Sequence, residues 1–324
     1  MTPLVIRTAQ DAIAAVPYLL GFHPSRSLVV IGFEGRNRGI CAIRLDLPSD
    51  AAERVAALLS GNGFARSLLL GYGPPGEVAE AVAPMRAALA AAGVPAVEAI
   101  RVGDGRWWSL TCDDDCCPPE GTPYDITGSV VAAQATFAGH VALADRTELV
   151  TSVAPLHDAS MHRATERAER RYLARPGNTA DEDLAFVLAL LLHAGSAVRP
   201  TDDEVAWLGL LLTDLRIRDE AWIRIDEEAP AADIAFWRDI VRRVHPDHVP
   251  APASLLAFAA YSAGDGGLAN VALERALDAD PAYSMAVILR QVINAGVPPS
   301  KLRIGMNPDQ LAAAYNDHPD QKAS

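Results

Sequence analysis

The sequence of 324 residues lacks the segments that identify exported and membrane proteins. Its longest uninterrupted apolar run, residues 184–192, is far shorter than the ~20 residues that cross a bilayer. The opening MTPLVIRTAQ has no basic stretch followed by an apolar segment, so it predicts no secretory signal. Four cysteines in such a chain indicate reduced thiols rather than a disulfide framework. We therefore expect a cytoplasmic protein with no membrane segment.

Basic residues are scarce, and the formal net charge is −13. Both halves are acidic: residues 1–150 contain 11 basic and 16 acidic residues, and the rest contains 17 basic and 25 acidic residues. A surface of this sign repels phosphate backbones, so we expect no nucleic-acid binding. The 50% hydrophobic content is ordinary for a globular protein, and the length predicts two domains.

Complete motifs for nucleotide binding or hydrolysis are also missing, including G-x-x-x-x-G-K-[ST], G-x-S-x-G and H-E-x-x-H. Gly71, Gly73 and Gly76 do form G-x-G-x-x-G between an expected strand and an expected helix. However, Pro74 and Pro75 lack backbone N–H groups that would face a pyrophosphate. A tight strand-to-helix turn explains these residues equally well. We therefore expect no nucleotide cofactor.

The first half of the chain alternates strand and helix patterns. Apolar strands are expected at 4–7, 27–33, 40–47, 67–72 and 97–102, and helices at 9–20, 51–59, 77–92 and 128–140. Gly21 is the expected left-handed cap of the first helix. The turn-like EGRNRG joins two neighbouring strands, which makes that pair antiparallel and the sheet mixed. The pattern predicts an α/β domain over residues 1–155, with helices covering a mixed sheet.

The second half has helical patterns, and we expect an all-α domain over residues 156–324. Thr179 with Glu182, and Thr201 with Glu204, have the spacing of a capping box, in which a hydroxyl and a carboxylate satisfy free amides of the first turn. Two helices are therefore expected to begin there.

An arginine-rich segment, residues 163–175, predicts a helix with a basic face. A solvated face is the commoner structure for such a helix. The alternative is contact with an acidic partner, which includes residues 226–233 of the same chain.

Residues 254–281 have the spacing of a tetratricopeptide (TPR) repeat. The large and small residues at the required positions are Leu256, Ala257, Ala269, Leu273, Ala276 and Pro281. Small residues let two antiparallel helices approach closely, and the proline ends the second helix. Because one repeat does not bury a continuous solenoid core by itself, an ordinary helical hairpin remains the alternative.

Three of the four cysteines, Cys112, Cys116 and Cys117, lie in TCDDDCCPPEGTPY. Three thiolates suit a soft metal, but adjacent cysteines chelate poorly and Cys-x₂-Cys pairs are absent, so no metal is expected. The aspartates at 113–115 raise a thiol pKa rather than lower it, which disfavours a reactive thiol. Small buried hydrophobic residues in a proline-rich loop are the favoured interpretation.

Three further residues are candidates for binding. His23 precedes the strand at 27–33, at its amino-terminal end, whereas ligands of open α/β sheets bind at carboxyl ends. A histidine that ties down a turn is therefore favoured. After the turn GDG, residues 106–110 predict an edge hairpin on which Trp107 and Trp108 either stack on a ligand or shield the sheet edge.

Three segments together resemble a known family: VPYLLGFHPSRSLVVIG, RWWSLTCDDDCCPPEGTPY and GDGGLANVALERALDADPAYSMAVILRQVINAGVPP. The chain is similar, from about Ile6 to Pro299, to an actinobacterial family known as domain of unknown function 4192 (DUF4192). The resemblance implies a cytoplasmic protein without an established activity, substrate or cofactor. It carries over no catalytic residue.

Two functions follow as hypotheses. The favoured one is a non-catalytic binding or adaptor protein whose TPR-like helical region binds a protein partner, without a cofactor. The rival is an enzyme, or a metal- or thiol-dependent protein, with its site near the loop from Cys112 to Tyr124. The sequence leaves the oligomeric state open.

Overall fold

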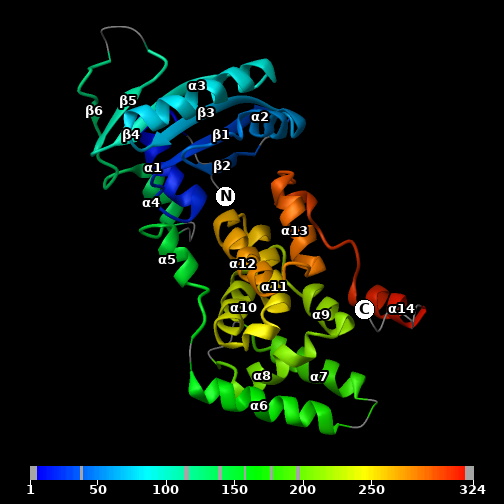
Figure 1. Ribbon diagram of the computed structural model, residues 1–324. Helices are drawn as coiled ribbons and strands as arrows, with labels where there is room; N and C mark the ends of the chain where they lie inside the picture. The colour runs from blue at the N-terminus through cyan, green and yellow to red at the C-terminus, as the bar shows by residue number, and fades with distance from the viewer. Residues whose placement is uncertain are drawn as a thin grey trace. The chain divides into compact units, whose positions relative to one another are not determined.

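The computed structural model describes residues 6–36, 39–112, 117–137, 141–156, 158–175, 177, 179–194 and 198–317 (Figure 1). The chain divides into two compact units, residues 1–149 and 150–324. Each unit is described by itself below.

The first unit contains a sheet of six strands in the order β2-β1-β3-β4-β5-β6. The strands are β1 (Ser27–Gly35), β2 (Cys41–Asp46), β3 (Phe64–Tyr72), β4 (Ala96–Gly103), β5 (Arg106–Ser109) and β6 (Thr122–Pro123). Only β3 and β4 are parallel; the other neighbouring strands pair antiparallel. Its helices are α1 (Ala9–Leu20), α2 (Ala52–Gly61), α3 (Pro75–Ala91) and α4 (Val130–Phe137), and α5 (Arg146–Thr151) begins in this unit. The expected mixed sheet with helices is confirmed.

Alternation along the strands directs side chains to two faces of this sheet. Leu28, Val30 and Leu69 pack with α2 and α3 into one hydrophobic core. The alternate residues, which include Val29 and Leu70, are also buried, and α1 lies on their side of the sheet (Figure 1). Both faces are therefore covered, which explains why the central strands are almost continuously apolar.

The predicted strand at 4–7 is wrong for the part that the structure describes, because Ile6 and Arg7 lie in no strand. Leu4 and Val5 lie outside the described residues. The amide of Arg7 donates to the carboxylate of Asp11, as does the amide of Thr8, at 3.0 and 3.1 Å. These main-chain donors complete the capping box that begins α1, so they are not offered to a sheet. Gly21 caps the other end of α1 with φ of 81°, as expected.

The second unit is helical. Its elements are α6 (Ala159–Ala174), α7 (Ala180–Leu191), α8 (Asp202–Leu211), α9 (Leu215–Trp222), α10 (Ala231–Arg243), the 3₁₀ turn η1 (Pro246–His248), α11 (Pro250–Ser262), α12 (Gly266–Ala279), α13 (Ser284–Asn294), the 3₁₀ turn η2 (Pro299–Lys301) and α14 (Pro308–Asp317). In the described part of the chain, no helix combines the length and apolarity needed to traverse a bilayer.

The centre of this unit is the pair α11 and α12, which pack along each other (Figure 1). Helix α11 is buried over residues 250–260, so it is a core helix rather than a surface one. Ala269 and Ala276 of α12 are completely buried and leave room for close approach. Helix α10 packs on α11, and α13 packs on both α11 and α12. Helices α10 and α13 therefore pack around the hairpin of α11 and α12.

One of the two predicted capping boxes is confirmed. The Thr201 hydroxyl accepts from the amide of Glu204, whose carboxylate accepts from the amide of Thr201. The box at Thr179 is wrong, because that residue makes no cap bond and its hydroxyl donates instead to Asp183 at 2.9 Å. Asp183 also accepts from Arg175 at 2.5 Å. The Thr179 hydroxyl therefore donates to the carboxylate of a buried ion pair and does not cap the helix.

Replacing Ala276 by Arg tests the packing of the central hairpin. Ala276 is completely buried, so a long charged side chain would be forced between closely packed helices. We expect a loss of roughly 3 kcal/mol or more in unfolding free energy, measured by thermal and urea unfolding followed by circular dichroism. Ala279→Arg, at an exposed position of the same helix, is the matched control and should melt close to the parent. Equal losses in the two variants would contradict this packing.

Candidate functional site

Strand pairing brings three turns to one edge of the sheet. The carboxyl ends of β3 and β4 share an edge because these strands are parallel. Strand β1 is antiparallel to β3, with Ser27 opposite Tyr72, so the turn before β1 lies at the same edge. His23 was expected at a strand end that ligands avoid. This expectation is wrong, because the antiparallel pairing puts the amino-terminal end of β1 beside the carboxyl end of β3.

Arg101 connects two of these turns. Its Nε donates to the carbonyl oxygen of Gly73 at 3.1 Å, and its guanidinium lies 3.9 Å from the centre of the Trp108 ring. Such stacking holds the planar group in one orientation. Within the described residues, Nη1 and Nη2 donate to no other group. Gly103 leaves space beside them, since a Cβ there would lie 3.3 Å from Nη2. Arg101 is therefore a positioned cation with two available donor groups.

Trp108 also holds the segment that follows the cysteines. Its Nε1 donates to the carbonyl oxygen of Pro119 at 3.1 Å. Arg106 donates to the carbonyl oxygen of Gly121 at 2.7 Å. A Cβ on Gly121, where φ is 79°, would come within 2.4 Å of the Trp108 ring, so only glycine fits this approach. The segment then pairs with β5 as β6, with Trp107 opposite Thr122. The expectation that the hairpin ends the sheet is therefore wrong, because β6 adds a strand outside β5.

The third turn is joined to α3 by an ion pair. Arg26, which has φ of 39°, donates to Glu77 in the first turn of α3 at 2.8 Å. The hydroxyl of Tyr72 is buried and has no hydrogen-bond partner among the described residues. Burial raises the pKa of Tyr72, and the neighbouring Tyr124 raises it further. Tyr72 therefore stays protonated, and its hydroxyl is an unused donor. We call Arg26, Glu77, Arg101 and Trp108 the sheet-edge cluster.

A polar network begins the cysteine-containing loop. Glu98 accepts from the hydroxyls of Ser109, at 2.9 Å, and of Thr111. The Ser109 oxygen in turn accepts from the amides of Thr111 and Cys112, at 3.3 and 3.1 Å. Because these bonds occupy its lone pairs, Ser109 is held as a turn-forming residue and not as an activated nucleophile. The network positions Cys112 at the start of the loop.

The structure places the predicted candidates in different surroundings. Cys112 and Cys117 are partly buried, and Cys116 lies outside the described residues. His23 is exposed, and the tie at its turn is made by its backbone, which donates to Leu143 at 3.0 Å. No group of three His, Cys, Asp or Glu side chains in the described ranges is arranged to hold a metal ion.

Sequence reasoning missed Arg101, Glu98 and Ser109. Each is a polar residue within a strand, which a motif search passes over. An isolated arginine near the end of the apolar β4 is the signal that points to Arg101, but its stacking partner appears only once β5 is paired.

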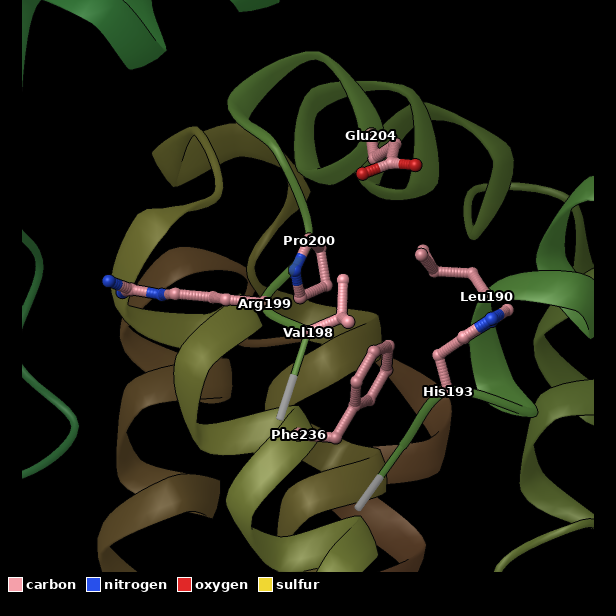
Figure 2. A pocket seen from close by; sticks show the side chains of 7 residues that line it. All are labelled: Leu190, His193, Val198, Arg199, Pro200, Glu204 and Phe236. Carbon is pink, nitrogen blue, oxygen red and sulfur yellow. The ribbon is translucent and has the colours of Figure 1, made fainter. Parts of the chain in front are cut away.

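Two shallow hollows of the described residues lie in the helical unit. The first has a volume of about 120 Å³, and its floor is formed by Leu190, Val198 and Phe236 (Figure 2). Three of its polar side chains are engaged. Glu204 serves the Thr201 cap, and Nδ1 of His193 lies 2.7 Å from the carbonyl oxygen of Ala189. Arg199, which extends away from the hollow in Figure 2, pairs with Asp239. A volume below the roughly 300 Å³ of small-molecule sites, with occupied polar groups, indicates packing geometry.

The second hollow, of about 200 Å³, lies between α6 and the end of α10 and includes Arg243 and His245. Arg243 is committed to Asp202 at 2.6 Å and Asp239 at 2.8 Å. Hydrogen bonds from Ser160 and Arg243 lower the pKa of Asp202, so this carboxylate stays ionised and paired. The hollow is therefore bordered by an internal ion-pair network.

His248 lies beside this network in η1. Both of its ring nitrogens are buried without a hydrogen-bond partner in the described residues. Burial, and secondarily the neighbouring His245, lower the pKa of His248. The close approach to α8 requires Gly209, since a Cβ there would lie 2.5 Å from Val244 and 3.2 Å from His248. The folded protein therefore holds His248 neutral.

The fold and these contacts define a protein with a mixed α/β sheet unit and a helical unit, in which the sheet-edge cluster offers a positioned cation. The sequence model of DUF4192, domain of unknown function, matches residues 10–300, and the chain belongs to this family. No curated protein and no solved structure matches the chain.

The neutral state of His248 predicts a pH dependence. Because the pKa of His248 is lower in the folded protein than in the unfolded chain, the unfolded chain binds the proton more readily. The folded state should lose stability as pH falls below the unfolded value of about 6.5. Urea unfolding between neutral and mildly acidic pH should therefore show a weaker pH dependence for His248→Leu than for the parent. His162→Leu, at an exposed position, should retain the parent's dependence; a parent-like slope in His248→Leu would refute the assignment.

Proposed function

We propose that the chain is a non-catalytic binding or adaptor protein that acts through its helical region. The observation that carries the proposal is the stacking of α13 on both α11 and α12, as the first helix of a further repeat stacks on a TPR hairpin. The burial of Leu256 and Leu273 at the expected inner positions supports the TPR-like interpretation.

The partner surface in this proposal is the outer side of α13. Helix α11 is buried, so the hairpin itself serves as scaffold. Met285, Ala286 and Leu289 fasten α13 to it. On the other side Ile288 is 57% exposed, and Gln291 beside it is exposed as well. An isoleucine on a rigid helix is the kind of apolar anchor that binds a partner helix at low entropic cost.

Replacing Ile288 by Arg tests this surface. The change should leave the melting temperature near that of the parent, because Ile288 is largely exposed, and it should remove the protein that co-purifies with the native chain. The measurement is quantitative mass spectrometry of material purified from the native cell, with a loss of at least about tenfold, or 1.4 kcal/mol, expected for the partner. Ala279→Arg introduces the same charge on α12 and should retain the partner. Retention of every co-purifying protein by the Ile288 variant would overturn the proposal.

A second candidate function is a ligand-dependent one, as an enzyme or thiol-dependent protein, at the sheet edge beside the loop from Cys112 to Tyr124. The specific observation that favours it is Arg101, whose two terminal nitrogens are available while Trp108 and Gly73 hold the guanidinium. A planar, oriented guanidinium binds carboxylates and phosphates through paired hydrogen bonds. The ligand class in this case is a small anion rather than a dinucleotide, because Pro74 and Pro75 still remove amide donors.

Melting the protein with citrate, phosphate and NAD separates the second candidate from the first. If Arg101 binds an anion, citrate or phosphate should raise the melting temperature in proportion to the logarithm of concentration above its Kd, and NAD should not exceed phosphate. Arg101→Met should abolish the increase, whereas Arg54→Met, at an exposed position of α2, should keep it. Equal increases in both variants would exclude a site at Arg101.

A further inference from the structure

Helix α6 has one face buried and one face exposed. Asp158 caps it, with a carboxylate that accepts from the amide of Ser160 at 2.8 Å. Met161, Ala164, Thr165 and Ala168 follow the helical repeat and are buried, and the helix packs on α8. The exposed face therefore consists of the remaining positions, most of which are charged.

The exposed face has more positive charge than its neighbours neutralise. Residues 159–175 contain five arginines and two glutamates. Arg167 pairs with Asp203, and Arg175 pairs with Asp183, each at 2.5 Å. Among the described residues, Asp203 and Asp183 are the acids outside the helix that its arginines contact, and residues 226–233 are not among them. Residues 226–233 instead meet the segment after η2, where Glu227 accepts from the amide of Ile304.

A third arginine, Arg171, lies over the ring of Trp207, with its guanidinium 4.1 Å from the ring centre. Arg163 and Arg170 are the two arginines that neither these ion pairs nor this ring contact engages. Arg163 has no ion-pair partner among the described residues, and Arg170 has only Glu166, at 4.0 Å. Glu166 also lies 3.4 Å from His162, and both side chains of the Glu166–Arg170 pair are about half exposed or more. Exposed pairs of this kind contribute little. Both arginines are therefore available to a partner.

These two arginines and Leu173 form one row along the helix. Arg163 and Arg170 are seven positions apart, which places them on the same face about 10.5 Å apart. Leu173 follows Arg170 by three positions and is 85% exposed. We call Arg163, Arg170 and Leu173 the α6 row. Glu169, the other acid of the helix, acts on His248 and so lies towards η1.

We propose that the α6 row binds an acidic helical segment of a partner protein. Two carboxylates seven positions apart on such a segment match the spacing of the arginines, and an apolar residue beyond them covers Leu173. Charge complementarity between a cationic row and an acidic helix gives fast association and orientation. This surface is separate from the outer side of α13, so either proposal stands if the other fails.

Other anionic partners fit less well. The net charge of −13 opposes association with a long phosphate polymer, whose field extends over the whole protein surface. An anionic membrane would need an apolar face to insert, and the apolar stripe of α6 is already buried against α8. A short acidic segment contacts only α6, where the local charge is positive, and so avoids the repulsion of the rest of the surface.

The test measures binding of a labelled helical peptide by fluorescence anisotropy at low ionic strength. The peptide carries two Glu residues seven positions apart and a Leu three positions later; a matched peptide carries Gln in place of Glu. We expect the Glu peptide to bind the full chain at least about tenfold more tightly than the Gln peptide, with affinity falling as salt is added. The double variant Arg163→Glu/Arg170→Glu should lose at least about tenfold in affinity for the Glu peptide.

The control variant, Arg54→Glu/Lys301→Glu, changes the net charge equally at exposed positions outside α6 and should bind like the parent. Circular dichroism checks that both variants are folded. Equal losses in the two variants would show a general charge effect and overturn the proposal. So would tighter binding of single-stranded DNA or phosphatidylserine vesicles than of the Glu peptide, or sedimentation of the parent as a dimer that the α6 variant dissociates.

Discussion

The antiparallel pairing of β1 with β3 determines which parts of the first unit meet. Backbone hydrogen bonds give each strand a direction, and Ser27 opposite Tyr72 brings the turn before β1 to the carboxyl ends of β3 and β4. Arg26, Gly73 and Arg101 come from three segments that are distant in sequence. They share an edge only because one strand pair is antiparallel and the next is parallel. The sheet-edge cluster follows from this arrangement.

In the helical unit, the corresponding constraint is the close packing of α11 and α12. Small residues such as Ala269 and Ala276 let the two helices approach, and burial of α11 along its length makes the pair the centre of the unit. Helices at the periphery then bury one side and expose the other. This division leaves Ile288 on α13 and the α6 row on the surface, where a partner has access to them.

Local signals were reliable where the chemistry involves neighbours in sequence. The Gly21 cap and the Thr201 capping box depend on residues within one turn, and both are present. The Thr179 box failed because Asp183, also bound by Arg175, takes its hydroxyl. The candidate site was only partly predictable, because it too depends on contacts that no local pattern shows. Trp108 was named from the sequence, but its partner Arg101 was not, since their contact joins two different strands.

The sequence by itself determined the class of the protein: a mixed sheet with helices followed by a helical region, in the DUF4192 family. Periodicity and caps are local properties, so they can be read from one chain segment at a time. Only the tertiary structure decided that β6 lies outside β5 and that Arg101 stacks on Trp108. It also decided that Arg163 has no ion-pair partner within the part of the chain that the structure describes. These contacts depend on which distant segments pack together, and the local pattern of a strand or helix does not specify its partner.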